Sequence, residues 1–162
     1  MNSIDIAYQG IPGSYSIQAL DYYFNGILHS NVSKPDFESV FSSLFTGKCQ
    51  YGIVPIENTL GGSIICNYDL LEKYSVKIVD EISFNIRHCL CCKESDDINS
   101  IDKIISHPQA LQQCKNNIKN INCHTELYSN TATSAKYVAD SSDNIACISS
   151  YKAAELYNLK IL

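Results

Sequence analysis

Four short segments combine glycine, serine, threonine or asparagine with amide or acidic side chains, the groups that bind anions and move protons. They lie at positions 10–16, 55–63, 106–113 and 129–134. Backbone N–H groups at helix N-termini form anion sites together with neutral side-chain donors. The same residue types also cap ordinary helices, so one such segment alone carries little weight. Four of them in one chain indicate a site for a carboxylate ligand.

A few side chains within these segments are candidates for catalysis. Asn58 and Gln113 carry amides, which both donate and accept hydrogen bonds without bearing charge. For Glu57 two interpretations stay open: a general acid or base, or a carboxylate that orients a neighbouring loop. His107 is either a proton shuttle or a half-exposed neighbour of a helix cap, because a proline follows it.

The segments must be positioned by regular elements, and each follows a predicted strand. We predict strands over residues 4–8, 51–55, 103–106, 123–128 and 145–149, and helices over 16–24, 37–45, 62–74, 131–139 and 151–157. One more helix carries Leu111, Cys114 and Ile118 on one face. The β-rich stretches 76–82 and 84–92 are either consecutive strands or one long, bent connection. Alternating strands and helices predict an α/β fold with a mainly parallel sheet, which binds ligands beyond the carboxyl ends of its strands.

Composition narrows the class of protein. The chain has 162 residues, 45% of them apolar and 18% charged, with a net charge of −5. These values are typical of a globular protein of one domain or two small lobes and do not suggest a nucleic-acid surface. We find neither an apolar run long enough to span a membrane nor a secretory signal, and we expect a cytoplasmic protein, or a plastid one if a transit peptide has been removed. Arg87 is the only arginine, so an anionic ligand must be bound mainly by other groups.

Eight cysteines allow three interpretations. A disulfide framework is typical of short secreted chains, and we find no secretory signal. Zinc needs ligands at tetrahedral spacing, and only Cys89, Cys91 and Cys92, near His88, are clustered. Because Cys91 and Cys92 point to opposite faces if this stretch is a strand, we predict no metal site and favour free, buried thiols.

Several motifs resemble those of the prephenate and arogenate dehydratases, in the same order and over nearly the whole chain. The motifs are Ala7-Tyr8-Gln9-Gly10 with Gly13-Ser14-Tyr15-Ser16, Gly52-Ile53-Val54-Pro55-Ile56-Glu57-Asn58-Thr59 with Gly61-Gly62-Ser63 and Asn67-Tyr68-Asp69-Leu70-Leu71, Ser106-His107-Pro108-Gln109-Ala110-Leu111-Gln112-Gln113-Cys114, and Ala153-Ala154-Glu155-Leu156-Tyr157-Asn158-Leu159.

The resemblance implies two α/β lobes, similar to type II periplasmic binding proteins, with the ligand cleft between them. We place the lobes at residues 1–83 and 84–162. It also implies that Glu57, Asn58 and Gln113 are catalytic. Expected substrate contacts are Ser14, Tyr15, Thr59, Gly61, Gly62, Ser63, Ser106, His107 and Thr131.

The implied reaction converts prephenate to phenylpyruvate, or arogenate to phenylalanine, without a cofactor or metal. The family's Thr-Arg-Phe motif, whose threonine is thought to protonate the departing hydroxyl, does not occur in this sequence, and neither does the regulatory domain that senses phenylalanine. We therefore expect a truncated or a degenerate member of a family that forms homo-oligomers. The alternative function is a non-catalytic module of the same fold that binds a small carboxylate.

Overall fold

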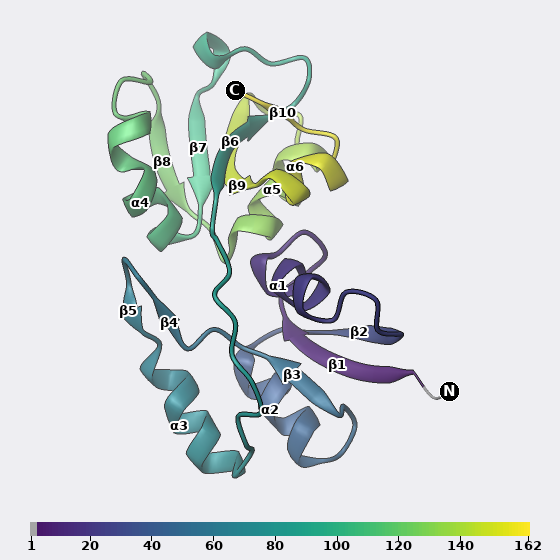
Figure 1. The fold of residues 1–162 in the computed structure, drawn as a ribbon. Helices are drawn as coiled ribbons and strands as arrows, with labels where there is room; N and C mark the ends of the chain where they lie inside the picture. The colour runs from purple at the N-terminus through teal and green to yellow at the C-terminus, as the bar shows by residue number, and fades with distance from the viewer. Residues whose placement is uncertain (1–2) are drawn as a thin grey trace. The chain divides into compact units, whose positions relative to one another are not determined.

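The computed structural model describes residues 3–162 and divides into two compact units. The first unit contains the chain up to Ile11 together with Tyr15–Asn85, and the second contains Pro12–Ser14 and Ile86–Leu162. The second unit is therefore built from two separate stretches of sequence. Each unit is an α/β layer structure with its own sheet (Figure 1).

The first unit has a three-stranded parallel sheet. Strand β1 (Ile4–Gln9) lies between β2 (His29–Lys34) and β3 (Tyr51–Ile53), and helices α1 (Tyr15–Tyr23) and α2 (Phe37–Phe45) connect them. Successive side chains of a strand point to opposite faces. Accordingly Ile6 and Tyr8 pack with Leu20 of α1, whereas Ala7 packs with Val40 of α2. The two helices thus cover opposite faces of the sheet (Figure 1).

A hairpin and a third helix complete the first unit. Strands β4 (Glu57–Asn58) and β5 (Gly62–Ser63) pair antiparallel, and helix α3 (Ile65–Tyr74) follows directly. At the end of α3, the Lys73 ammonium and the Tyr74 hydroxyl both donate to the Glu38 carboxylate of α2, at 2.5 and 3.0 Å. These bonds lower the pKa of Glu38. They fix the helix that carries the hairpin.

The second unit has a five-stranded mixed sheet in the order β10-β6-β9-β7-β8. Strands β7 (Lys103–Ser106), β8 (His124–Leu127) and β9 (Ile145–Ser150) are parallel, and β6 (His88–Cys92) runs antiparallel to β9 and to β10 (Lys160–Ile161). A 3₁₀ turn, Ile98–Ser100, precedes β7.

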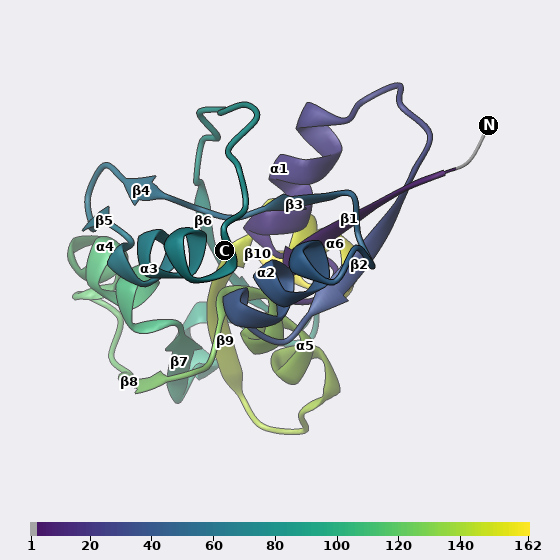
Figure 2. The same cartoon turned by 90° about the horizontal axis from the view of Figure 1, so that it is seen from below.

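Helices cover both faces of this second sheet. Helix α4 (Pro108–Ile118) lies on one face, and α5 (Thr131–Asp140) and α6 (Tyr151–Leu156) on the other. Figure 2 shows α4 and α5 on opposite sides of β7 and β9. The alternation along β9 explains this, because Ile145 and Cys147 pack towards α5 while Ala146 and Ile148 pack towards α4.

Some predicted elements differ from those observed. The predicted helix over 62–74 begins only at Ile65, because Gly62 adopts φ +74° in the hairpin that precedes it. The stretch 76–82 forms no strand, and 84–92 becomes β6 only from His88. The alternative of one long connection is therefore correct for residues 76–87 and wrong for 88–92. Strand β2 was not predicted, since its sequence is mostly polar and its pattern of burial is that of a partly exposed edge.

Among residues 3–162, no helix is long and apolar enough to cross a membrane.

Candidate active site

The hairpin β4–β5 carries most of the candidate residues of the first unit. Asn58 Oδ1 accepts from the backbone N–H groups of Leu60 and Gly61, at 2.9 and 3.1 Å, and so closes the turn. The side-chain nitrogen of Asn58 makes no hydrogen bond within the described residues. One end of this amide therefore shapes the loop, and the other end can donate to a ligand.

Glu57 lies at the start of the same hairpin, opposite Ser63. It is exposed, and its carboxylate makes no hydrogen bond or ion pair in the part of the chain that the structure describes. Thr59, Gly61 and Gly62 are exposed around the turn. All six sequence-predicted residues of this segment are thus brought together on one small, accessible hairpin.

A buried asparagine fixes the base of this hairpin. Asn67 of α3 is fully buried, and its Nδ2 donates to the Pro55 carbonyl at 2.7 Å. The Ile64 N–H donates to the Ile56 carbonyl at 2.8 Å. From the sequence, Asn67 was expected only as part of a motif and had no predicted role. Asn67 lies four residues after the end of β5, in the first turn of α3. We interpret its buried amide as a positioning group, because leaving it unpaired would be costly.

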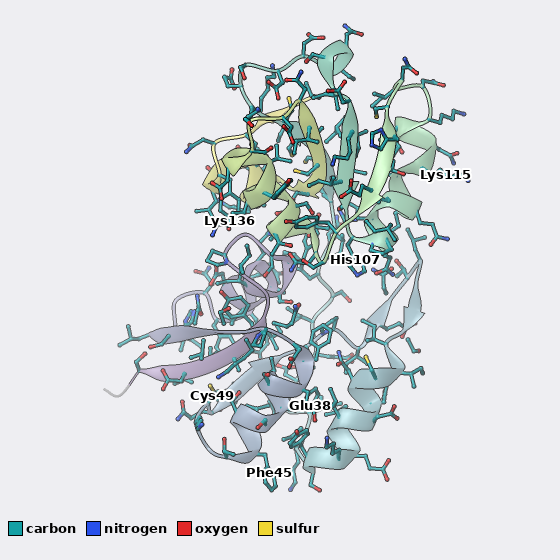
Figure 3. All side chains as sticks on the ribbon, turned by 180° about the vertical axis from the view of Figure 1, so that it is seen from behind. Glu38, Phe45, Cys49, His107, Lys115 and Lys136 are labelled. Carbon is teal, nitrogen blue, oxygen red and sulfur yellow. The ribbon has the colours of Figure 1, made fainter. Side chains whose placement is uncertain are left out.

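In the second unit, three helices begin at one edge of the sheet. Strands β7, β8 and β9 are parallel, so their carboxyl ends share an edge, and α4, α5 and α6 start there. The side chains of His107, Asn130 and Ser150 each accept from a backbone N–H of the helix that they cap. Figure 3 shows His107 where α4 begins. This edge presents backbone N–H groups and the positive ends of two full-length helices, α4 and α5.

Two serine hydroxyls at this edge hold the sheet and its helices together. Ser106 is fully buried, and its Oγ donates to the Ile148 carbonyl of β9 at 2.6 Å. Ser149 Oγ donates to the Thr131 carbonyl at 2.8 Å. The single hydroxyl proton of Ser106 is therefore committed to the protein, and only its lone pairs remain. Thr131 is half-buried at the first turn of α5.

Gln113 lies on α4 facing the start of β6. Its Oε1 is 2.9 Å from Nε2 of His88. A carbonyl oxygen can only accept, so the imidazole donates through Nε2. Burial lowers the pKa of His88, and the hydrogen bond to Gln113 opposes that shift. The amide nitrogen of Gln113 makes no hydrogen bond among residues 3–162.

The loop before α1 contributes to both units. Gly13 has φ +88°, and a Cβ at this position would come within 3.0 Å of Ala153 Cα. The Gly13 carbonyl accepts from Ser150 Oγ at 2.9 Å, which ties the loop to the second unit. Ser14 is buried there, whereas Tyr15 is half-buried in the first unit. The two predicted substrate contacts of this loop thus belong to different units.

The cysteines are all free thiols. Cys91 and Cys147 face each other across β6 and β9, and hydrogen bonding to Cys91 together with burial raises the pKa of Cys147. Among residues 3–162, no group of three or more His, Cys, Asp or Glu side chains is arranged to hold a metal ion.

Comparison with known proteins identifies the family. The sequence profile described as "Prephenate dehydratase" matches residues 6–162. The chain is 35% identical over 160 residues to "Arogenate dehydratase/prephenate dehydratase 2, chloroplastic" of Arabidopsis thaliana; the match covers 98% of this chain and 42% of the relative. The chain thus spans about two fifths of the length of that relative.

Two solved structures share the fold. A prephenate dehydratase from Arthrobacter aurescens, in complex with L-Phe, superposes with a TM-score of 0.87 at 21% identity, covering 98% of this chain and 54% of that one. A protein titled "GqqA- a novel type of quorum quenching acylases" gives a TM-score of 0.86 at 26% identity, with coverage of 98% and 57%. The predicted α/β fold is confirmed.

Several independent features agree with the profile match over residues 6–162: the motifs, their order along the chain and the fold. The resemblance found in the sequence is confirmed, and the chain belongs to the prephenate dehydratase family.

Proposed function

We propose that this chain carries the catalytic function of a dehydratase that aromatises prephenate or arogenate. The observation that carries the proposal is the match to the prephenate dehydratase profile over residues 6–162, which takes in both units. Relatives of the chain are named for both substrates. The substrates differ in a keto or an amino group on the side chain, and the assay below distinguishes them.

The proposed reaction removes the ring carboxylate and the ring hydroxyl of a cyclohexadiene. The carbon–carbon bond to the carboxylate breaks and releases CO₂, and its electron pair enters the ring. In the same step that electron pair expels the hydroxyl at the opposite ring carbon, whose carbon–oxygen bond breaks, and the hydroxyl takes up a proton from a general acid and leaves as water. The enzyme must hold the substrate in the reactive pose and assist the leaving group.

Neutral donors suit this chemistry. A firm ion pair with the ring carboxylate would stabilise the charge that must flow into the ring, and so would slow the reaction. Amides and helix N-termini bind the carboxylate with less ground-state stabilisation. The Gln113 amide nitrogen, which has no partner among residues 3–162, and the first turns of α4 and α5 are groups of this kind.

We assign roles to the candidate residues on this basis. The Asn58 and Gln113 amide nitrogens donate to substrate oxygens. Glu57, which is exposed and makes no ion pair among the described residues, tunes the departure of the hydroxyl. Thr131 offers its side chain at the first turn of α5, and Ser106 chiefly holds the strand end from which His107 caps α4.

The test is a direct assay with each substrate. The purified chain is incubated with prephenate and separately with arogenate, and phenylpyruvate and phenylalanine are quantified by chromatography against a blank without protein. Formation of either product above the blank supports the proposal and identifies the substrate. Saturable binding without product, from both substrates and at high protein concentration, would instead favour a non-catalytic carboxylate-binding module and overturn the proposal for this chain.

Partners and compartment remain part of the proposal. We expect a small-molecule substrate, no nucleic-acid or membrane partner, and assembly into homo-oligomers, which sedimentation velocity measures. The named Arabidopsis relative is chloroplastic, so we propose either the cytoplasm or a plastid as the compartment. Imaging a fluorescent fusion of the chain in the source cell distinguishes the two.

A further inference from the structure

The hydrogen bond between His88 and Gln113 has no role in the catalytic proposal above. Gln113 needs its amide nitrogen turned towards the substrate, but an amide can rotate by half a turn and present its oxygen instead. An oxygen aimed at a carboxylate would repel it. Some group must therefore select one of the two orientations, and only a donor to Oε1 or an acceptor for Nε2 can do so.

His88 is placed to make this selection. It is the first residue of β6, and its ladder partner is Ser150, the residue that caps α6. The imidazole therefore lies at the edge of the sheet where the helices begin. Its Nε2 lies 2.9 Å from Gln113 Oε1, and Oε1 makes no other hydrogen bond among residues 3–162.

We propose that His88 is a positioning residue that fixes the orientation of the Gln113 amide, so that Gln113 Nε2 faces away from His88 and one of its N–H groups donates to a substrate oxygen. His88 does not touch the substrate in this role and acts through Gln113. The inference rests on the proposed function for its substrate, but the orientation of the amide is a property of the free protein.

Charge and backbone support the same arrangement. Burial favours the neutral imidazole, and a neutral ring whose Nε2 carries the proton donates one well-directed bond to the glutamine oxygen. The ladder to β9 holds the histidine backbone, and α4 holds the glutamine backbone. Both partners thus start from regular elements, as a positioning pair requires.

The first experiment tests the orientation without turnover. NMR of the isotope-labelled chain observes the His88 Nε2 proton and the two Gln113 side-chain amide protons. We expect His88 to be protonated on Nε2, and the Gln113 signals to move towards those of a solvated amide in the His88→Phe variant. His124→Phe, a change at an exposed histidine on β8 of the same unit, should leave them unchanged. Identical Gln113 signals in wild type and His88→Phe would overturn the proposal, whatever the chain does with prephenate.

The second experiment tests coupling in catalysis. We expect His88→Phe to lower kcat/KM for the active substrate about 10-fold, the effect of one lost hydrogen bond near a charged ligand. In a Gln113→Met background the same change should alter kcat/KM by less than about 2-fold, because the residue acts through the missing amide. His88→Gln, which keeps an N–H donor, should recover part of the loss.

The two proposals fail in different ways. Independent, multiplicative effects of His88→Phe and Gln113→Met would overturn the positioning role while leaving the dehydratase intact. A wild-type chain with no turnover of either substrate would contradict the proposed function, and the NMR comparison would then decide the positioning role alone. Circular dichroism on each variant establishes that it is folded, and His88→Leu, which also lacks an N–H donor, replaces His88→Phe if the latter is not.

Discussion

Asn58 uses the two ends of its amide for different purposes. The oxygen closes the turn of hairpin β4–β5, and the nitrogen has no partner among residues 3–162. Substitutions that remove one end and keep the other can therefore separate the shape of the loop from its proposed chemistry. The separation matters because a disordered hairpin would also lower turnover.

Asn58→Asp keeps an oxygen for the turn and removes the N–H donors. We expect kcat/KM to fall about 10- to 100-fold, the range for losing a hydrogen bond to a charged group, while thermal stability stays near that of the wild type. Asn58→Ala should lose both turnover and stability. Asn116→Asp, an exposed position on α4, is the matched control. Full turnover in Asn58→Asp would remove Asn58 from the site.

The thiols should differ widely in reactivity. Cys66 is exposed near the start of α3, whereas Cys92 and Cys147 are buried. Burial raises the pKa of Cys92, and the hydrogen bond with Cys91 together with burial raises the pKa of Cys147. The thiolate is the reactive form. We expect one thiol, that of Cys66, to react rapidly with Ellman's reagent in the native protein, and all the thiols to react in denaturant. A Cys66→Ser variant that still shows a rapid phase would contradict this.

His88 should make the stability depend on pH. Burial lowers its pKa below the ordinary value near 6.5, so the unfolded chain binds a proton more readily than the folded one. This contribution to stability is complete above about pH 6.5 and is lost as the pH falls through the folded pKa. Urea titrations at about pH 7.5 and pH 5.5 should show a smaller drop in unfolding free energy for His88→Phe than for the wild type. Equal drops would contradict the assignment.

For single residues, the sequence indicated which residue types occupy the candidate site but not which hydrogen bonds their side chains make. Asn58 and Gln113 were predicted as donors from their place at strand ends and in motifs. His88 received no role, because its partner is 25 residues away in sequence and on another element. Ser106 was expected to contact substrate. Its hydrogen bond to the Ile148 carbonyl joins residues 42 apart in sequence, so the local sequence pattern could not predict it either.

Helix caps connect the residues to the elements that carry them. Asn130 begins α5 by accepting from the Thr133 N–H at 2.8 Å, and its own carbonyl accepts from Thr133 and Ser134 hydroxyls. The cap sets the position of Thr131, the first residue of that helix. Losing the side-chain acceptor should therefore act on both stability and the site.

We expect Asn130→Ala to lower the unfolding free energy by about 1 kcal/mol, the usual cost of a lost N-cap. Asn130→Asp keeps the acceptor and adds a negative charge at a helix N-terminus, so it should be close to neutral or slightly stabilising. Chemical denaturation followed by circular dichroism measures both. An alanine variant as stable as the wild type would show that the cap contributes little to this helix.

Elements with a strong apolar period were predictable, and elements without one were not. Helix α2 was predicted over its whole length from Phe37 to Phe45, since its apolar residues recur at helical spacing. The hairpin β4–β5 has two residues in each strand and no alternation that a sequence can reveal. Its turn forms because Asn58 Oδ1 accepts from two backbone N–H groups and Gly62 adopts a positive φ. Neither residue alone would indicate this turn.

At the scale of the whole chain, the stretch 76–87 stands out as extended backbone outside any strand. Within the first unit, the Tyr23 hydroxyl donates to the Asp80 carboxylate at 2.6 Å, and the Phe84 ring centroid lies 6.0 Å from that of Tyr22. Ile78 and Val79 are 63% and 75% exposed. Exposed segments without regular hydrogen bonding are favoured substrates for proteases.

Limited trypsin digestion should therefore cut first after Lys77, which is exposed within this stretch. Mass spectrometry should find two fragments that meet at that residue, ahead of any cut in a helix. Lys77→Gln should slow the first cut, whereas Lys115→Gln, within α4, should not. An initial cut after Lys73 in α3 or after Lys115 in α4 would contradict the expectation that the helices resist digestion longer than the connection does.

The short stretch Pro12–Ser14 has a consequence for the order of synthesis. It is synthesised well before Ser150 and Tyr157, which lie 137 and 145 residues further along the chain and donate to the carbonyls of Gly13 and Pro12. The second unit therefore cannot complete these hydrogen bonds until synthesis has passed Tyr157. During translation the loop lacks these two partners for that whole interval, in which a chaperone that binds nascent chains can act.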